Sequence, residues 1–262
     1  MERRKKVALV LSGGGALGFA HVGVIKVLEK YNIPIDIVVG TSMGGIVGAA
    51  YSAGVSSDEM YEFACKFRAT DFLDVNLFDK TGILSGKGVM KTINKLLPEE
   101  NIEHLEKQFA CVAVDLYSEK EVVFKTGPVR EAVRATMSIP GVFVPLKKDG
   151  MLLVDGGILN NLPEDVAMEM GADIIISCDV LSTSKLTKVP KNAFVTLFYS
   201  INSSTKEIQK LKANHSDVLI QPDLADLSTF SFGADNAKLA IKKGEKAALK
   251  KLEQIAQIIN ED

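Results

Sequence analysis

The chain of 262 residues is 47% hydrophobic and 24% charged, so it can bury a substantial core. Its formal net charge of −2 argues against nucleic acid as the main partner. The three cysteines show neither a disulfide framework nor a metal-binding spacing, which suits a reducing compartment and predicts a cytoplasmic location: Cys65, Cys111 and Cys178.

The chain opens on a predicted buried strand at Val7–Leu11, followed by a glycine-rich turn and a helix at Ala20–Tyr31. The apolar run before Ser12 has five residues and three glycines follow it, which disfavours a signal peptide. The sequence contains no run of 18 apolar residues, so no membrane-spanning helix is predicted.

A second buried strand is predicted at Ile35–Val39, followed by a helix of small residues at Gly44–Ser52. Residues 55–108 change character and are predicted as a helical insertion, with one helix at Val89–Leu97. Further strands are predicted at Phe109–Asp115, Val122–Lys125, Met151–Val154, Asp173–Cys178, Phe194–Tyr199 and Val218–Ile220, and further helices at Val129–Met137, Glu164–Glu169, Thr205–Asn214 and Ala234–Ile259.

This alternation predicts the fold class. Strands that are apolar along their whole length are typical of a parallel sheet covered on both faces. We therefore predict an α/β protein, one three-layer α/β/α domain over residues 1–262 with a mainly parallel central sheet and a helical insertion near 55–108.

The turn after the first strand reads SGGGALG and fits G-x-G-x-x-G through Gly13, Gly15 and Gly18. In a dinucleotide-binding fold the second strand should end in an acidic residue that holds the ribose. Here the acidic residue, Asp36, lies near the start of that strand, so the context that would confirm a dinucleotide site is missing. A nucleotide-binding oxidoreductase stays open as an alternative on this motif alone.

The end of the second strand carries G-x-S-x-G in the form Gly40, Thr41, Ser42, Met43, Gly44. This pattern is typical of a nucleophile elbow, in which a strand turns sharply into a helix and the serine sits strained at the corner. The glycines on either side are needed where neighbouring backbone comes too close for a Cβ atom. The structural alternative is a serine that caps a helix of small residues.

An acyl-transfer nucleophile also needs donors for the oxyanion. Backbone N–H groups at a glycine-rich turn supply them. Gly13, Gly14 and Gly15 end the first strand, next to the expected place of Ser42 in a parallel sheet.

The base has two kinds of candidate. The chain contains three histidines, of which His104 lies in a polar segment and His21 on the first helix. The order Ser42, Asp155, His215 would match an α/β-hydrolase triad. The better candidate is Asp155 itself, because it follows an apolar strand and two glycines allow close backbone approach after it.

These segments resemble the patatin-like phospholipases, serine lipid acyl hydrolases with a Ser–Asp dyad, and within them the compact bacterial branch. The resemblance covers nearly the whole chain. It is carried by SGGGALGFAHVGV, GTSMG, ATMSIPGVFVPL, DGGILNNLP and LIQPDLADLSTFSF.

The resemblance implies that Ser42 is the nucleophile and Asp155 the base, with N–H groups of Gly13, Gly14 and Gly15, joined by Met43, as the oxyanion hole. It implies hydrolysis of lipid or acyl esters, as by a phospholipase A or lysophospholipase, without metal or cofactor. Many members carry a basic residue where Leu17 stands, which predicts weak discrimination of the head group. The motif glycines are Gly18, Gly40, Gly44, Gly156 and Gly157.

The sequence also allows other interpretations. One is a noncatalytic protein that retains the fold and binds a partner through the insertion. The predicted C-terminal helix carries an apolar face and many lysines, so it could make peripheral contact with an anionic membrane, although packing on the core is favoured. The sequence leaves the oligomeric state open.

Overall fold

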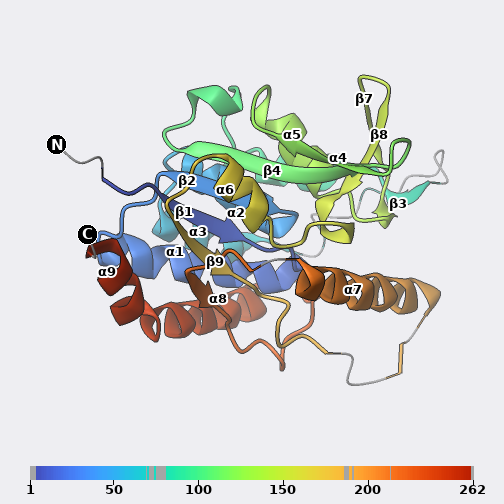
Figure 1. The fold of residues 1–262 in the computed structure, drawn as a ribbon. Coiled ribbons are helices and arrows are strands. Elements are labelled where there is room, and N and C mark those ends of the chain that lie inside the picture. Colours follow the sequence, from blue (N-terminus) through green and yellow to red (C-terminus); the bar gives the residue numbers. More distant parts are fainter. Residues whose placement is uncertain are drawn as a thin grey trace.

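The computed structural model describes residues 4–68, 70, 74, 81–185, 189–190, 192–212 and 214–260. Its centre is a sheet in the order β10-β9-β1-β2-β4-β8-β7, with β5 paired to β4 (Figure 1). The strands β10, β9, β1, β2 and β4 run parallel, and β5, β7 and β8 are antiparallel to their neighbours. Their bounds are β1 Val7–Leu11, β2 Ile37–Thr41, β4 Gln108–Asp115, β5 Lys120–Phe124, β7 Leu146–Lys148, β8 Met151–Asp155, β9 Ile174–Cys178 and β10 Val218–Ile220.

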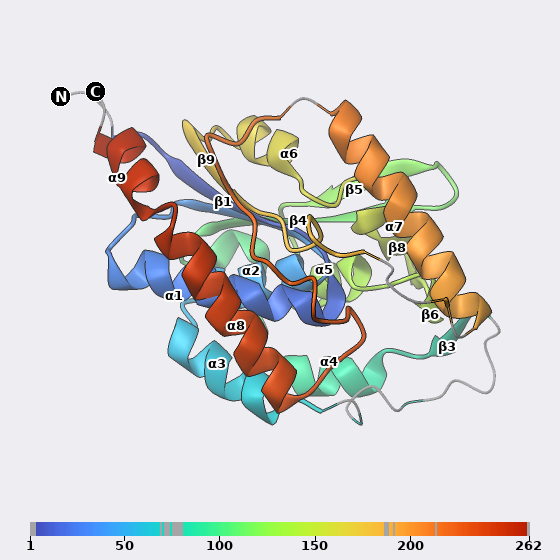
Figure 2. The ribbon, with the colours of Figure 1, turned by 90° about the horizontal axis from the view of Figure 1, so that it is seen from below.

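Helices cover both faces of this sheet, which confirms the predicted three layers. On one face lie α1, α2, α3, α5 and α8, and they share the larger apolar core with the sheet. In Figure 2, α1, α3 and α8 lie below the strands and α6 lies above them. The opposite face packs against α6 through a smaller core. The bounds are α1 Ala20–Lys30, α2 Met43–Ser52, α3 Ser57–Lys66, α5 Val129–Thr136, α6 Glu164–Glu169 and α8 Ala234–Leu249.

The register of β4 brings two strand ends together. β2 pairs with the first part of β4, and its last residue Thr41 lies opposite Val112. β8 runs the other way along the same edge, because β5 occupies the other edge, and its last residue Asp155 lies opposite Ala113. The C-terminal ends of β2 and β8 therefore point at each other.

The segment predicted as a helical insertion contains α3 and α4 (Lys87–Ile93), with residues 69, 71–73 and 75–80 outside the described part of the chain. It also contains the strand β3 (Gly82–Leu84), which pairs with β6 (Gly141–Phe143) in a small second sheet. The side chain of Arg134, on α5, donates to the carbonyl oxygens of Ser85 and Val144 and so ties the insertion to the segment before β7.

One predicted strand is wrong. The segment Phe194–Tyr199 was predicted as a strand because it is rich in aromatic and β-branched residues, but it belongs to one helix, α7 (Ala193–Leu211). The Asn192 side chain accepts from the Val195 N–H at 2.9 Å and caps this helix.

The predicted C-terminal helix is divided into α8 and α9 (Leu252–Asn260). Its apolar face packs on the core, since Ala248 and Ile255 are buried there. None of the helices in the described ranges is long and apolar enough to span a membrane.

Candidate active site

Ser42 occupies a strained corner between β2 and α2. Its backbone has φ 54° and ψ −122°, a conformation that costs a non-glycine residue about 1–3 kcal/mol. A Cβ atom on Gly40 would lie 2.3 Å from the Gly44 carbonyl oxygen, and one on Gly44 would lie 2.1 Å from the Leu11 carbonyl oxygen. The two glycines therefore allow the close contact that the corner requires.

Two polar residues, one at the end of α5 and one just after it, hold the strand ends in place. The Ser42 N–H donates to Thr136 Oγ1 at 2.9 Å, and the Thr136 hydroxyl donates to the Val112 carbonyl at 2.5 Å. The Asp155 N–H donates to the Ser138 carbonyl at 2.9 Å. The sequence analysis did not identify Thr136 and Ser138 as anchors. Their hydrogen-bond partners are distant in the chain, and the segment ATMSIPGVFVPL gives no sign that its polar residues make these bonds.

The side chains of Ser42 and Asp155 meet at this point. The Ser42 hydroxyl lies close enough to the Asp155 carboxylate to stabilise its charged form, and Asp155 Oδ1 accepts from the Gly157 N–H at 2.8 Å. Burial raises the pKa of Asp155 to about 6, and these two contacts oppose that rise. A carboxylate with this pKa is a stronger base than an exposed aspartate.

The turn at Gly13–Gly15 faces the serine. The Gly13 N–H donates to the Asn161 carbonyl at 3.1 Å, and Asn161 Nδ2 donates to the Gly13 carbonyl at 3.4 Å. Within the described ranges, the N–H groups of Gly14 and Gly15 have no acceptor. The N–H of Met43 opens the first turn of α2, where helices leave donors free.

The remaining motif glycines are sites of close packing. A Cβ atom on Gly15 would lie 2.6 Å from the Thr229 carbonyl oxygen, and one on Gly18 would lie 2.3 Å from Met43 Cγ. Neighbouring protein atoms thus fill the space beside the turn. The side chain of Leu17 is buried in the core, and a Cβ atom on Gly156 would lie 2.4 Å from a β4 carbonyl.

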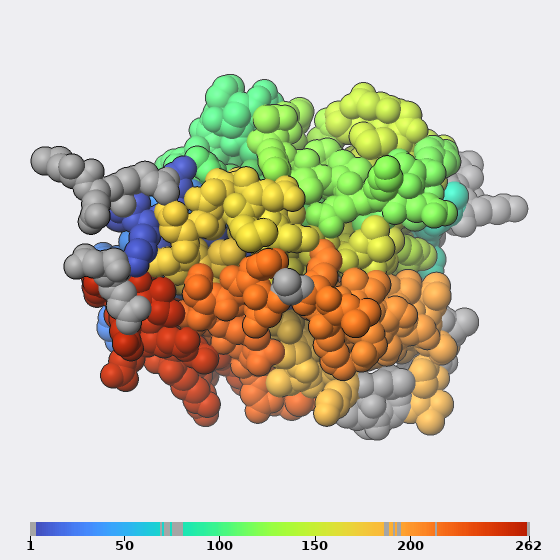
Figure 3. Space-filling view, in the orientation of Figure 1, coloured from blue at the N-terminus to red at the C-terminus, as the bar shows by residue number. Residues whose placement is uncertain are grey.

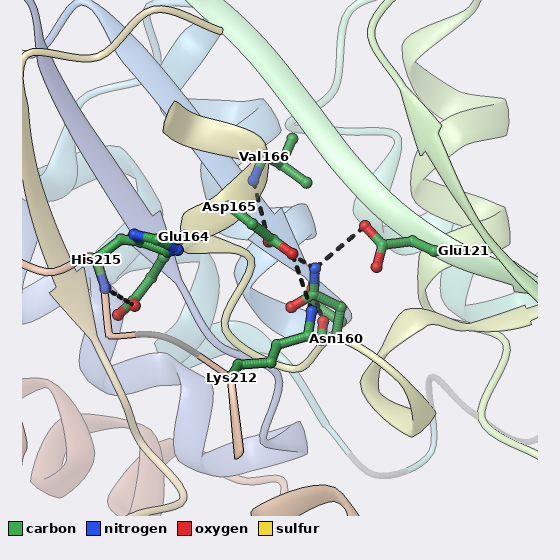
Figure 4. Close-up of polar contacts among 8 residues, drawn as sticks. Glu121, Asn160, Glu164, Asp165, Val166, Lys212 and His215 are labelled. Atoms are coloured by element: carbon green, nitrogen blue, oxygen red, sulfur yellow. Dashed lines mark hydrogen bonds and ion pairs between the residues drawn. The ribbon is translucent and has the colours of Figure 1, made fainter. Parts of the chain in front are cut away.

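The three histidines lie away from the dyad. His21 is fully buried, its Nε2 is 2.9 Å from the Ser12 carbonyl oxygen, and burial lowers its pKa to about 4. His104 is exposed. The backbone N–H of His215 donates to Glu164 at the start of α6, in a separate polar cluster (Figure 4). The geometry does not assemble the Ser42–Asp155–His215 triad that chain order allowed.

Two pockets meet at Ser42. The first, called the apolar pocket, is lined by side chains of α2, α3 and α4 and by a group of phenylalanines. The ring of Phe67 lies 6.3 Å from Phe19, 5.8 Å from Phe63 and 6.0 Å from Phe232. The second, called the dyad pocket, contains both catalytic candidates, the glycine turn and part of α7. In the described part of the chain, no group of three or more His, Cys, Asp and Glu residues could hold a metal ion.

Fold and site together define an α/β protein with a serine at a strained corner between a strand and a helix. The chain belongs to the patatin-like phospholipase family, whose model matches residues 9–168. The resemblance seen in the motifs is confirmed.

Similar proteins include patatin-like phospholipase domain-containing protein 6 of Mus musculus, which is 32% identical over 87% of this chain and 19% of its own length. Lysophospholipase nte1 of Aspergillus fumigatus is 35% identical over 75% of this chain and 13% of its own length. The chain thus spans less than a fifth of the length of these relatives.

Solved structures share the fold. VipD from Legionella pneumophila superimposes with a TM-score of 0.58 at 15% identity, over 96% of this chain and 67% of that chain. Human GIVD cytosolic phospholipase A2, in complex with methyl gamma-linolenyl fluorophosphonate, superimposes with a TM-score of 0.57 at 11% identity, over 99% of this chain and 60% of that chain. At these identities the likeness shows the fold, and the predicted fold class is confirmed.

Proposed function

We propose that the protein is a carboxylic ester hydrolase that cleaves lipid or acyl esters through an acyl-enzyme on Ser42, with Asp155 as the base. The observation that carries this proposal is the placement of the strained serine beside a buried carboxylate in one pocket. Family membership supports it, and the name of the Aspergillus fumigatus relative adds lysophospholipase activity as the expected type.

The mechanism follows from the positions of the two side chains. As Ser42 Oγ attacks the ester carbonyl carbon, its proton passes to the Asp155 carboxylate. The protonated Asp155 then donates that proton to the departing alkoxide. In the second half, water attacks the acyl carbon and gives a proton to Asp155. Asp155 returns this proton to Ser42 Oγ as the Oγ–acyl bond breaks, and the fatty acid leaves.

The negative charge on the carbonyl oxygen is stabilised by backbone donors. We assign this role to the N–H groups of Gly14, Gly15 and Met43, since the Gly13 N–H already donates to Asn161. The dipole at the N-terminal end of α2 stabilises this negative charge by about 0.3–1 kcal/mol, or by up to about 2 kcal/mol where the site is partly buried. These steps use no metal or cofactor.

The apolar pocket supports a substrate with an acyl chain. Phenylalanine, methionine and aliphatic side chains line it, and Ser42 lies at its end. Burial of a methylene group contributes about 0.8 kcal/mol, so a longer chain should bind more tightly until the pocket is filled. Access to lipid implies peripheral contact with a membrane surface, and the three free thiols fit a cytoplasmic protein.

The test compares wild type with Ser42→Ala on p-nitrophenyl esters of increasing chain length and on lysophospholipids. We expect the variant to fold and to lose at least about 10⁴-fold in kcat, because no other group can form the acyl-enzyme. A fluorophosphonate should label wild type at Ser42. Near-normal turnover by Ser42→Ala would remove this serine from the mechanism, and cleavage of acetyl esters alone would contradict a lipid substrate.

A further inference from the structure

Helix α7 borders the dyad pocket on the side away from the apolar pocket. Its residues Phe198, Ile201 and Asn202 line the dyad pocket. One turn later, the Thr205 hydroxyl donates to the Gly157 carbonyl at 2.8 Å, which holds the helix against the aspartate turn. Figure 3 shows α7, in orange, at the molecular surface. The leaving group of an ester on Ser42 would therefore extend toward this helix.

A second hollow, called the outer pocket, lies along the next strip of α7. Asn202 lines both the dyad pocket and the outer pocket, so the two are neighbours across one side chain. Lys206 follows Asn202 at i+4, and Lys185 faces the same hollow from the segment after β9. The outer pocket thus adds two positive charges beside the leaving-group side of the site.

The charges around Lys206 leave it without a full counterion. Its Nζ donates to the Ser184 carbonyl, and burial, Lys185 and Lys210 lower its pKa while Asp179 raises it. Within the described residues, neither Lys185 nor Lys206 forms an ion pair with a carboxylate. A bound anion would relieve the repulsion between these lysines.

Two side chains of the outer pocket can still donate hydrogen bonds to an anion. The hydroxyls of Ser200 and Ser203 are not among them, because they donate to backbone carbonyls one turn earlier on α7. Among the described residues, the side chains of Asn202 and Tyr199 have no hydrogen-bond partner, so their N–H and O–H groups are free to donate.

We propose that the outer pocket binds a phosphate group carried by the leaving-group alcohol, with Lys206 as its main cation, Lys185 as its second, and Asn202 between phosphate and dyad. This proposal rests on the proposed ester hydrolysis and names its substrate class, a phosphorylated acyl ester. In a lysophospholipid the phosphate lies a few bonds beyond the ester oxygen, on the side that α7 borders.

The experiment compares lysophosphatidic acid with monoacylglycerol of the same chain, both in neutral mixed micelles. Lys206→Gln should raise KM for the phosphorylated substrate about tenfold, because it removes a charge-assisted hydrogen bond, and leave monoacylglycerol within about twofold. Lys206→Arg should keep most of the preference. Lys210→Gln, an exposed lysine on the same helix that pairs with Glu207, should change neither substrate. An equal loss on both substrates, or no loss on either, would overturn the proposal.

A second experiment shows whether the outer pocket prefers a phosphorylated head group to free phosphate. It also tests the phosphate site independently of ester hydrolysis. Glycerol 3-phosphate should bind to Ser42→Ala in calorimetry and bind about tenfold more weakly when Lys206→Gln is added. Inorganic phosphate that binds as tightly as glycerol 3-phosphate, with no substrate preference in the kinetics, would overturn the head-group assignment. Absence of any ester hydrolysis by wild type would refute the proposed function, while this binding measurement would still test the phosphate site.

Discussion

Two aspartates ten residues apart, the buried Asp155 and the half-buried Asp165, belong to opposite faces of the sheet and have opposite electrostatics. Asp165 accepts from Asn160 Nδ2 at 2.9 Å and from Lys212 Nζ at 3.0 Å, and these partners outweigh burial and lower its pKa (Figure 4). Asp155 has a hydroxyl and one backbone N–H as partners, and burial raises its pKa to about 6. A carboxylate with a cation beside it stabilises the fold, whereas one without a cation is available as a base.

The neighbouring residues Asn160 and Asn161 contact different regions, Asn160 the polar cluster around Asp165 and Asn161 the glycine turn beside Ser42. Asn160 is fully buried and binds Glu121 and Asp165, and its carbonyl accepts from the Thr41 hydroxyl at 2.8 Å. Asn161 faces the other way and holds the glycine turn through Gly13. One short segment therefore contacts both the end of β2, through Thr41, and the glycine turn, through Gly13.

The strongest way to break this comparison is to exchange each aspartate for its amide and measure turnover. We expect Asp155→Asn to lose about 10²–10⁴ in kcat, because an amide cannot accept the serine proton. Asp165→Asn should stay within about threefold, as should His215→Ala. An inactive but folded His215→Ala would return the base to histidine and refute the dyad.

The glycine turn can be tested through its packing on Val180. A Cβ atom on Gly14 would lie 2.5 Å from Val180 Cγ2, so Gly14→Ala should displace the oxyanion donors and lower kcat about 10²-fold with a smaller change in KM. The double variant Gly14→Ala/Val180→Ala should recover most of that loss. Unchanged kcat in folded Gly14→Ala would argue that this turn binds no oxyanion.

Stability should respond in opposite directions in the two regions. The pKa of Asp155 is about 6 in the folded state against an ordinary value of 3.8, so the folded state holds a proton that the unfolded state releases between these pH values. Wild type therefore loses stability as pH rises through this window. Asp155→Asn should be more stable at pH 8 by up to about 3 kcal/mol, with the gain fading near pH 4.

The lowered pKa of Asp165 gives the reverse sign, with stability present at neutral pH and lost in acid. Asp165→Asn should cost about 1 kcal/mol or less at pH 8, because the ion pair with Lys212 is partly exposed. Urea unfolding at both pH values measures the two effects. Destabilisation by Asp155→Asn at pH 8 would show that this carboxylate serves the fold rather than catalysis.

The pH profile gives the smallest effect and sharpens the assignment of the base. Because Asp155 must be ionised to accept a proton, kcat/KM should fall about tenfold between pH 7 and pH 5, along a limb centred near its pKa of about 6. The Asp165→Asn variant should keep the same limb. If the acid limb of the kcat/KM profile shifted in pH in Asp165→Asn, or disappeared in His21→Asn, the titration would belong to a group other than Asp155.

Much of the site could be predicted from the sequence because its requirements are local. The corner at Ser42 needs Gly40 and Gly44, and the turn after β1 needs its glycines, whatever the rest of the chain does. The buried strands β1, β2 and β9 were visible as continuous apolar runs. Local preference failed for α7, where β-forming residues lie in a helix held by its cap and by contacts near Gly157.

By itself, then, the sequence determined the family, the order of the strands along the chain and the residue types at the dyad, since glycine spacing and apolar runs act over a few residues. The tertiary structure decided how Asp155 reaches Ser42. The expected parallel arrangement is replaced there by antiparallel β8, which ends opposite Ala113 on the edge of β4 that β2 also uses. It also decided the pKa of Asp155, the anchoring by Thr136 and the walls of the pockets, because burial and contacts between distant segments exist only once the chain has folded.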